Sequence, residues 1–291
     1  MIPDYICNIM FLSAKRAGIP YHTYRTDEQF RPDIENIGEL LKSENVCAIL
    51  FASILGTQNN TSNILQSIRE IAPEVTIIFD ECQNIITNSP LKMDKHTVVV
   101  ISFNNKTVPG LMGGALCFPL DARLEISPPV RKAASKLRYE LLLWAVLGKR
   151  ILKRFQGVLM VIGGKVLNYE LPSIEFSVCG NDHYDVEPNP ASKLSMIYAY
   201  RGLCKLPELE NLRRANYNLL NEEMKQRGEK IVIETDLIEI SPYIPVQLTD
   251  IELFKYLPIK GPYSIEEDST QSHRPDVFCI KNNNNGISYQ N

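Results

Sequence analysis

The chain has 291 residues, of which 44% are apolar and 22% are charged, so it can bury a sizeable core and is not disordered over most of its length. Thirty-one Lys and Arg against 34 Asp and Glu give a net charge of −3, which argues against a partner held by bulk phosphate attraction, such as a nucleic acid. No apolar run reaches the roughly 18 residues of a membrane span. The length predicts about two domains.

The cysteines and the N-terminus indicate a reducing, cytoplasmic setting. The N-terminus lacks the basic region and cleavage site of a signal peptide. No C-x-x-C spacing occurs, and the four histidines show no metal-ligand spacing, so no metal site is expected. The seven cysteines are odd in number and often lie within apolar runs, as small core residues do: 7, 47, 82, 117, 179, 204 and 279.

The first part of the chain predicts a helix, a short strand and a second helix. Apolar residues recur at near-helical spacing from Pro3 or Asp4 to Ala17, and Gly18 ends that helix. A short strand over 19–24 and a helix over 33–43 follow.

Continuous apolar runs then alternate with helical segments. Strands are predicted at 46–54, 75–81, 97–103 and 113–118, and a helix begins at Thr61 or Ser62 and extends to about Ala72. Such alternation is typical of βαβ units, so the fold class is α/β with a mainly parallel sheet.

A proline-rich segment at 118–130 predicts a domain boundary, with an α/β large domain over 1–124 and a smaller α+β domain over 125–291. The second domain is expected to contain a long basic helix over 131–155, a helical region over 190–226 with a break near Pro207, and a strand over 231–234. The Asn-rich tail is low in complexity and is expected to be a loop.

Three motifs carry the candidate chemistry. Asp80 ends a predicted buried strand, where a carboxylate can pair with a cationic ring nitrogen, bind a metal or cap the next turn. Lys106 follows the next strand, where it is either a solvated loop lysine or a desolvated nucleophile toward a carbonyl. The paired Gly113 and Gly114 permit positive φ or a close backbone approach beside a ligand.

In this order the motifs resemble those of fold-type-I pyridoxal-phosphate enzymes, and more narrowly the DegT/StrS family of sugar aminotransferases. The family pattern is a strand ending in D-x-x-Q, a strand ending in S-F, a lysine and a glycine pair. The matching residues are Asp80 with Gln83, Ser102 with Phe103, Lys106, and Gly113 with Gly114. The resemblance extends over about residues 5–225.

The resemblance implies a role for each matched residue. Lys106 would bind pyridoxal 5′-phosphate as a Schiff base and then act as the general acid–base. Asp80 would pair with the pyridine nitrogen, Gln83 would contact the ring or its 3-oxygen, and Ser102 would bind the phosphate. Asn189, in the segment EPNPAS, matches the family asparagine that reaches a partner subunit's phosphate.

The same resemblance implies a homodimer that transfers an amino group, usually from glutamate, to a keto sugar nucleotide for polysaccharide or cell-surface sugar synthesis. The N-terminal part of the family's large domain, which cradles the phosphate, lies before the point that matches Met1. A catalytically inactive relic or fragment, kept for dimerisation or as a scaffold, is therefore the alternative prediction.

Two further alternatives follow from single segments. The run VTIIFDE also fits the Mg²⁺-binding strand of a P-loop NTPase, but no G-x-x-x-x-G-K-[ST] loop accompanies it. The apolar and basic segment 139–164 fits either an interfacial membrane helix or a core or dimer-interface helix, and the second interpretation is favoured.

Overall fold

The computed structural model describes residues 1–7, 9–27, 29–54, 61–83, 93–103, 113–122, 191–231, 243–247, 259–260 and 278–281, together with the single residues 108, 144 and 148. Trp144 and Gly148 are helical, and the remainder of the helix predicted at 131–155 lies outside the described residues. So do the Asn-rich tail and two of the predicted site residues, Lys106 and Asn189.

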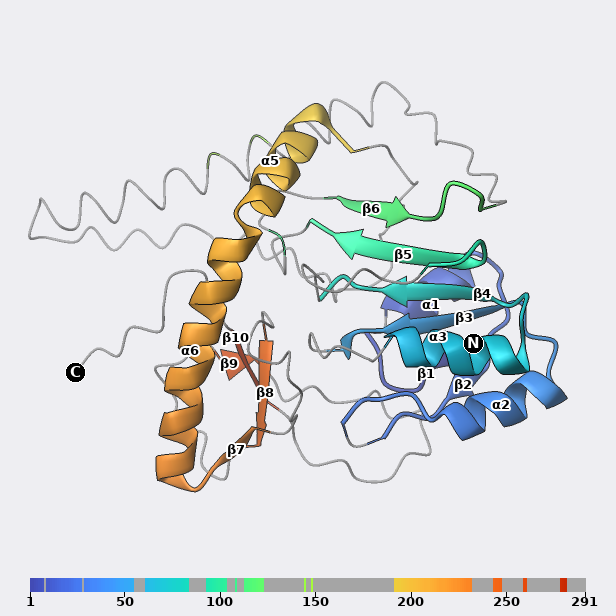
Figure 1. The fold of residues 1–291 in the computed structure, drawn as a ribbon, viewed down its shortest axis with the longest axis horizontal. Helices are drawn as coiled ribbons and strands as arrows, with labels where there is room; N and C mark the ends of the chain where they lie inside the picture. The colour runs from blue at the N-terminus through green and yellow to red at the C-terminus, as the bar shows by residue number, and fades with distance from the viewer. Residues whose placement is uncertain are drawn as a thin grey trace, which may run out of the picture.

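A four-stranded sheet in the order β3-β4-β5-β6 forms the centre of the first part (Figure 1). The strands are β3 (Ala48–Ala52), β4 (Thr76–Asp80), β5 (Thr97–Ser102) and β6 (Gly114–Cys117). β3, β4 and β5 are mutually parallel, and β6 is antiparallel to β5. The prediction of a mainly parallel sheet is therefore confirmed.

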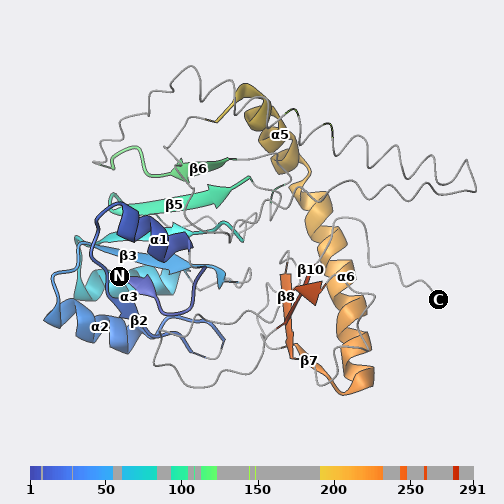
Figure 2. The same ribbon diagram turned by 180° about the vertical axis from the view of Figure 1, so that it is seen from behind.

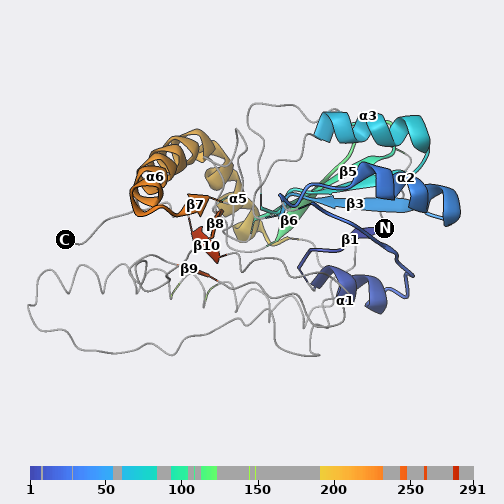
Figure 3. The same cartoon turned by 90° about the horizontal axis from the view of Figure 1, so that it is seen from below.

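Helices cover both faces of this sheet. In Figure 3, α2 (Ile34–Ser43) and α3 (Thr61–Ile71) lie on one face and α1 (Ile9–Arg16) on the other. Alternate residues of each strand turn toward α2 and α3 and exclude water, because successive side chains of a strand point to opposite faces. The buried cluster consists of Tyr24, Ile37, Ile49, Phe51, Ile64, Leu65, Ile68, Val75, Ile77, Phe79 and Val99.

The first helix begins later than the sequence predicts. Ile2–Pro3 forms strand β1, which pairs in parallel with β2 (Thr23–Tyr24), and the Met1 carbonyl accepts a hydrogen bond from Leu50 N–H of β3. Asp4 does not begin a helix because its Oδ1 accepts hydrogen bonds from Thr26 N–H and Oγ1 at 3.1 and 2.6 Å. The prediction of a helix from residue 3 or 4 was wrong because this long-range contact uses the capping carboxylate.

The second part contains two consecutive helices and a small sheet. α5 (Lys193–Cys204) and α6 (Leu206–Arg227) meet at Lys205, which confirms the predicted break near Pro207. The second four-stranded sheet has the order β7-β8-β10-β9 and is antiparallel. Its strands are β7 (Lys230–Ile231), β8 (Tyr243–Gln247), β9 (Ile259–Lys260) and β10 (Phe278–Lys281), and Figure 2 shows α6 beside them.

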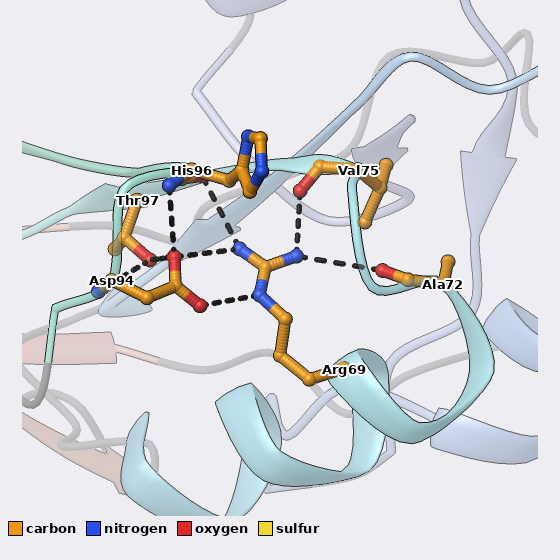
Figure 4. A network of polar contacts seen from close by, with 6 residues as sticks. All are labelled: Arg69, Ala72, Val75, Asp94, His96 and Thr97. Carbon is orange, nitrogen blue, oxygen red and sulfur yellow. Dashed lines mark hydrogen bonds and ion pairs between the residues drawn. The ribbon is translucent and has the colours of Figure 1, made fainter. Parts of the chain in front are cut away.

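Arg69 of α3 ties together the amino ends of β4 and β5 (Figure 4). Its guanidinium donates to the carbonyl oxygens of Ala72 and Val75, which precede β4, at 3.4 and 2.6 Å. It also donates to the Asp94 carboxylate and to the His96 carbonyl, which precede β5. One side chain therefore satisfies backbone acceptors at two neighbouring strand entries.

Asp94 is ionised in this network. Its partial burial raises the pKa, but hydrogen bonds from Arg69, Thr97 and the His96 N–H, together with the Arg69 charge, outweigh burial and lower the pKa to about 2. Since the folded-state pKa lies below the ordinary value of 3.8, the stabilisation is complete above that value and is lost as the pH falls toward 2.

Replacing Arg69 with alanine should lower the free energy of unfolding by about 2–4 kcal/mol, because several backbone and carboxylate acceptors lose their donor. The Arg69 side chain is 17% exposed. Arg31→Ala is the matched control, since Arg31 is 59% exposed and pairs with Asp27 at the surface. Chemical denaturation should show a change within about 0.5 kcal/mol for the control, and equal effects of the two variants would contradict the structural role of Arg69.

Candidate functional site

The carboxyl ends of β3, β4 and β5 lie along one edge of the sheet, and their arrowheads in Figure 1 point toward the side on which α5 and α6 lie. Asp80, the last residue of β4, is in register with Ala52 of β3 and Val100 of β5. Ser102 lies two residues beyond Val100, so it shares the face on which Asp80 lies. The structure thus brings these two predicted site residues to the same edge and the same face.

The turn after β4 fixes the orientation of Asp80. Its Oδ1 accepts a hydrogen bond from Cys82 N–H at 3.0 Å, as in an Asx turn. Its Oδ2 has no hydrogen-bond partner within the described part of the chain. Gln83 lies in the same turn, and its Oε1 is buried without a hydrogen-bond partner among those residues. One carboxylate oxygen and one buried amide oxygen are thus available to a ligand.

Gly113 and Gly114 permit the backbone conformation and the close strand approach found at this edge. Gly113 has a φ of +98°, and its carbonyl accepts a hydrogen bond from Phe103 N–H at 2.8 Å. A Cβ on Gly114 would lie 2.4 Å from the Ile101 carbonyl oxygen, closer than any side chain tolerates. Both properties expected of the pair, positive φ and close approach, are present, and they serve the pairing of β5 with β6.

The start of α5 reaches the same edge. A Cβ on Gly113 would lie 3.7 Å from the Cβ of Ala191, in ordinary van der Waals contact. Ser192 follows as the N-cap of α5, and its buried Oγ accepts a hydrogen bond from Ser195 N–H at 3.0 Å. A residue of the second part of the sequence thus lies beside the glycine pair.

Glu81 is a buried carboxyl that the sequence analysis left without a role. Its side chain is 3% exposed, and its Oε2 accepts a hydrogen bond from Ser53 Oγ at 2.6 Å. Burial raises the pKa of Glu81 to about 7; the Ser53 hydrogen bond opposes this rise and the Asp80 charge adds to it. The sequence did contain a signal for this buried pair: Ser53 lies near the end of one predicted strand, and Glu81 is a second carboxyl at the end of the next.

Asp80 and Glu81 do not converge on a metal as the P-loop NTPase alternative requires. Asp80 shares its face with Ser102, whereas the neighbouring Glu81 turns to the side of the buried residue Phe79 and bonds to Ser53. Within the described residues, no group of three or more His, Cys, Asp or Glu side chains is arranged to hold a metal ion. None of the helices described there is long and apolar enough to cross a membrane.

The described residues fit the ring end of pyridoxal phosphate. A cationic ring nitrogen suits the open carboxylate oxygen of Asp80, and the side-chain amide of Gln83 offers an N–H donor for the 3-oxygen of the ring. Ser102 is half-buried at the end of β5, at the level of Gly114. The positions of Lys106 and Asn189 relative to these groups lie outside the described residues.

Solved structures share this fold. The chain superposes on the sugar aminotransferase CalS13 from Micromonospora echinospora with a TM-score of 0.60 and 14% identity, over 96% of this chain and 74% of that one. For a DegT DnrJ EryC1 StrS aminotransferase from Brucella abortus the TM-score is 0.56, with 14% identity over 96% and 72%. For DesI, determined with its TDP-sugar product, it is 0.57, with 14% identity over 96% and 68%.

The chain therefore has the fold of the fold-type-I pyridoxal-phosphate aminotransferases. Within that class it is similar to DegT/StrS sugar aminotransferases, so the expected resemblance is confirmed at the level of the fold. No family model matches the sequence, and no curated protein matches it by sequence.

Gly114→Ala should destabilise the protein or displace β6, because the new methyl group meets backbone that cannot move aside. We expect a loss of about 2 kcal/mol or more in the free energy of unfolding. Gly38→Ala is the matched control: it lies in α2, and its Cβ would meet only the end of the Ile71 side chain at 3.4 Å. The control should be neutral or stabilising, and an equally mild Gly114→Ala would contradict the close approach.

Stability should depend on Glu81 between roughly pH 5 and 7. The unfolded chain releases this proton near the ordinary pKa of 4.5, whereas the folded chain keeps it until about 7, so stability falls as the pH rises through this interval. The loss should be about 2–3 kcal/mol. Chemical denaturation across this pH range should show that the free energy of unfolding depends less on pH in Glu81→Gln than in the wild type. Glu74 is exposed and precedes the same strand, so Glu74→Gln should show the same pH dependence as the wild type. Parallel profiles of the wild type and Glu81→Gln would contradict a buried protonated carboxyl.

Proposed function

We propose that the protein is a pyridoxal-phosphate-dependent aminotransferase that transfers an amino group to a keto sugar nucleotide. The observation that carries the proposal is the edge formed by Asp80 and Ser102 beside the turn that ends in Gln83. This edge occurs in a fold that the chain shares with sugar aminotransferases.

The cofactor, when bound, supplies an electron sink that stabilises negative charge on the substrate carbon. Asp80 holds a proton on the ring nitrogen by presenting a negative oxygen to it, and its Asx turn keeps that oxygen oriented before the ligand arrives. Gln83 orients the ring through its buried amide. The proposal gives Ser102 and Asn189 a role in holding the phosphate.

Lys106 is the proposed covalent attachment residue and general acid–base, on the strength of its place in the sequence motif. Its amine would hold the cofactor covalently and would serve as the acid–base group that moves a proton at the reacting carbon of the substrate. Glutamate is the proposed amino donor, and the TDP-sugar product of DesI supports a nucleotide-linked sugar as the acceptor class. A cytoplasmic homodimer acting in polysaccharide or cell-surface sugar synthesis completes the proposal.

The test is the visible absorbance of the purified protein after incubation with pyridoxal phosphate and desalting, followed by borohydride reduction and peptide mapping. We expect a retained chromophore in the wild type, with the reduced adduct on Lys106, and none in Lys106→Ala. Lys15→Ala removes an exposed lysine from α1 and should keep the chromophore. Addition of glutamate should then shift the spectrum of the wild type.

Three other outcomes of this absorbance experiment would change the proposal. A wild type that retains no chromophore would overturn the enzyme proposal and leave a non-catalytic protein with an aminotransferase fold. An adduct on a different lysine would keep the cofactor and remove Lys106 from its role. A chromophore that glutamate does not change would argue against this amino donor.

A further inference from the structure

Ser53 links the two adjacent carboxyl residues at the end of β4. Its N–H donates to the Asp80 carbonyl at 3.0 Å, and its hydroxyl donates to Glu81 Oε2 at 2.6 Å. The Glu81 N–H in turn donates to the Val100 carbonyl of β5 at 2.9 Å. The ladder therefore continues for one residue beyond β4 on both sides, and Ser53 is bonded both to the Asp80 backbone and to the Glu81 side chain.

No cation neutralises Glu81 within the described residues. Ser53, the residue after β3, contributes an uncharged hydroxyl, and Val100 of β5 contributes a backbone carbonyl. Arg69 of the covering helix α3 is engaged at the opposite end of the strands. Asp80 is the charged group whose field reaches Glu81. Burial beside a second carboxyl, with a single hydroxyl as partner, shifts Glu81 toward its protonated form.

The two carboxyls face different surroundings. Asp80 presents an open oxygen at the edge where the ligand is proposed to bind, whereas Glu81 is buried on the side of Phe79 and bonds to Ser53. The negative charge of Asp80 adds to the rise in the pKa of Glu81. A positive group that pairs with Asp80 would cancel part of the field at Glu81 and so favour its ionisation.

We infer that Glu81, held by Ser53, is a positioning residue that carries a proton on behalf of the Asp80 site, and that a cationic ring nitrogen binding at Asp80 releases this proton from Glu81 to solvent. The inference rests on the proposed function for the nature of the ligand. The coupling between the two carboxyls is a property of the protein without ligand. Glu81 touches neither ligand nor reacting atoms; it acts through Asp80.

The test is a carbon-13 NMR titration of the protein labelled at its Glu side-chain carboxyls, with the Glu81 signal assigned by its loss in Glu81→Gln. We expect the Glu81 midpoint to fall by about half a pKa unit or more in Asp80→Asn. It should rise in Ser53→Ala, which removes a hydrogen bond to the charged form. Glu74→Gln, at an exposed carboxylate, should leave it unchanged. Circular dichroism of each variant verifies that it is folded.

A midpoint near the ordinary value of 4.5 in the wild type, or a midpoint that Asp80→Asn leaves in place, would overturn the inference. If Ser53→Ala unfolds, the Glu81 midpoints of the wild type and Asp80→Asn are still sufficient to test the inference. Adding pyridoxal phosphate should lower the Glu81 midpoint in the wild type and not in Asp80→Asn. If the protein does not bind the cofactor but Asp80→Asn still lowers the Glu81 midpoint, the proposed function fails and this inference stands. If the protein retains the chromophore but Asp80→Asn leaves the Glu81 midpoint in place, this inference fails and the proposed function stands.

Discussion

The candidate site depends on the register of the parallel strands β3, β4 and β5. Large apolar side chains such as Phe51 and Phe79 occupy the face beneath α2 and α3, and this burial fixes which alternate residues turn inward. A slip of one residue would place Asp80 in the core and expose Phe79. The hydrophobic pattern therefore positions the carboxylate, although none of the apolar residues takes part in the chemistry.

The charged groups at the two ends of these strands differ in how they are paired. At the amino end, Arg69 and Asp94 neutralise each other and saturate the backbone acceptors around them. At the carboxyl end, Asp80 keeps an open oxygen, Gln83 keeps a buried acceptor, and Glu81 is buried without a described cation. The first arrangement stabilises the fold, although the buried His96 Nε2 there also lacks a hydrogen-bond partner among the described residues. The second places its open polar groups at the strand ends where the ligand is proposed to bind.

Local signals predicted the strands of the main sheet and its helices, but not β8, β9 and β10 of the second sheet. Long-range contacts account for the differences in the first part. Apolar runs identified the strands of the main sheet, and Asp33 caps α2 where the pattern placed its start. The first helix was predicted too early because Asp4 bonds to Thr26, 22 residues away. Glu81 escaped notice for the same reason, since its partner Ser53 is 28 residues distant and follows a different strand, β3.

If the Ser53–Glu81 pair only joined two strands, it would do so at a cost in folding free energy, because it buries a carboxyl. An apolar pair at these positions would extend the core above Phe51 and Phe79 without burying a carboxyl. A titratable carboxyl behind Asp80 has a consequence that an apolar residue lacks: a cation bound at Asp80 would shift Glu81 toward its negatively charged form. Because that second charge strengthens the hold on the cation, the pair couples the ionisation of a core residue to the occupancy of the site.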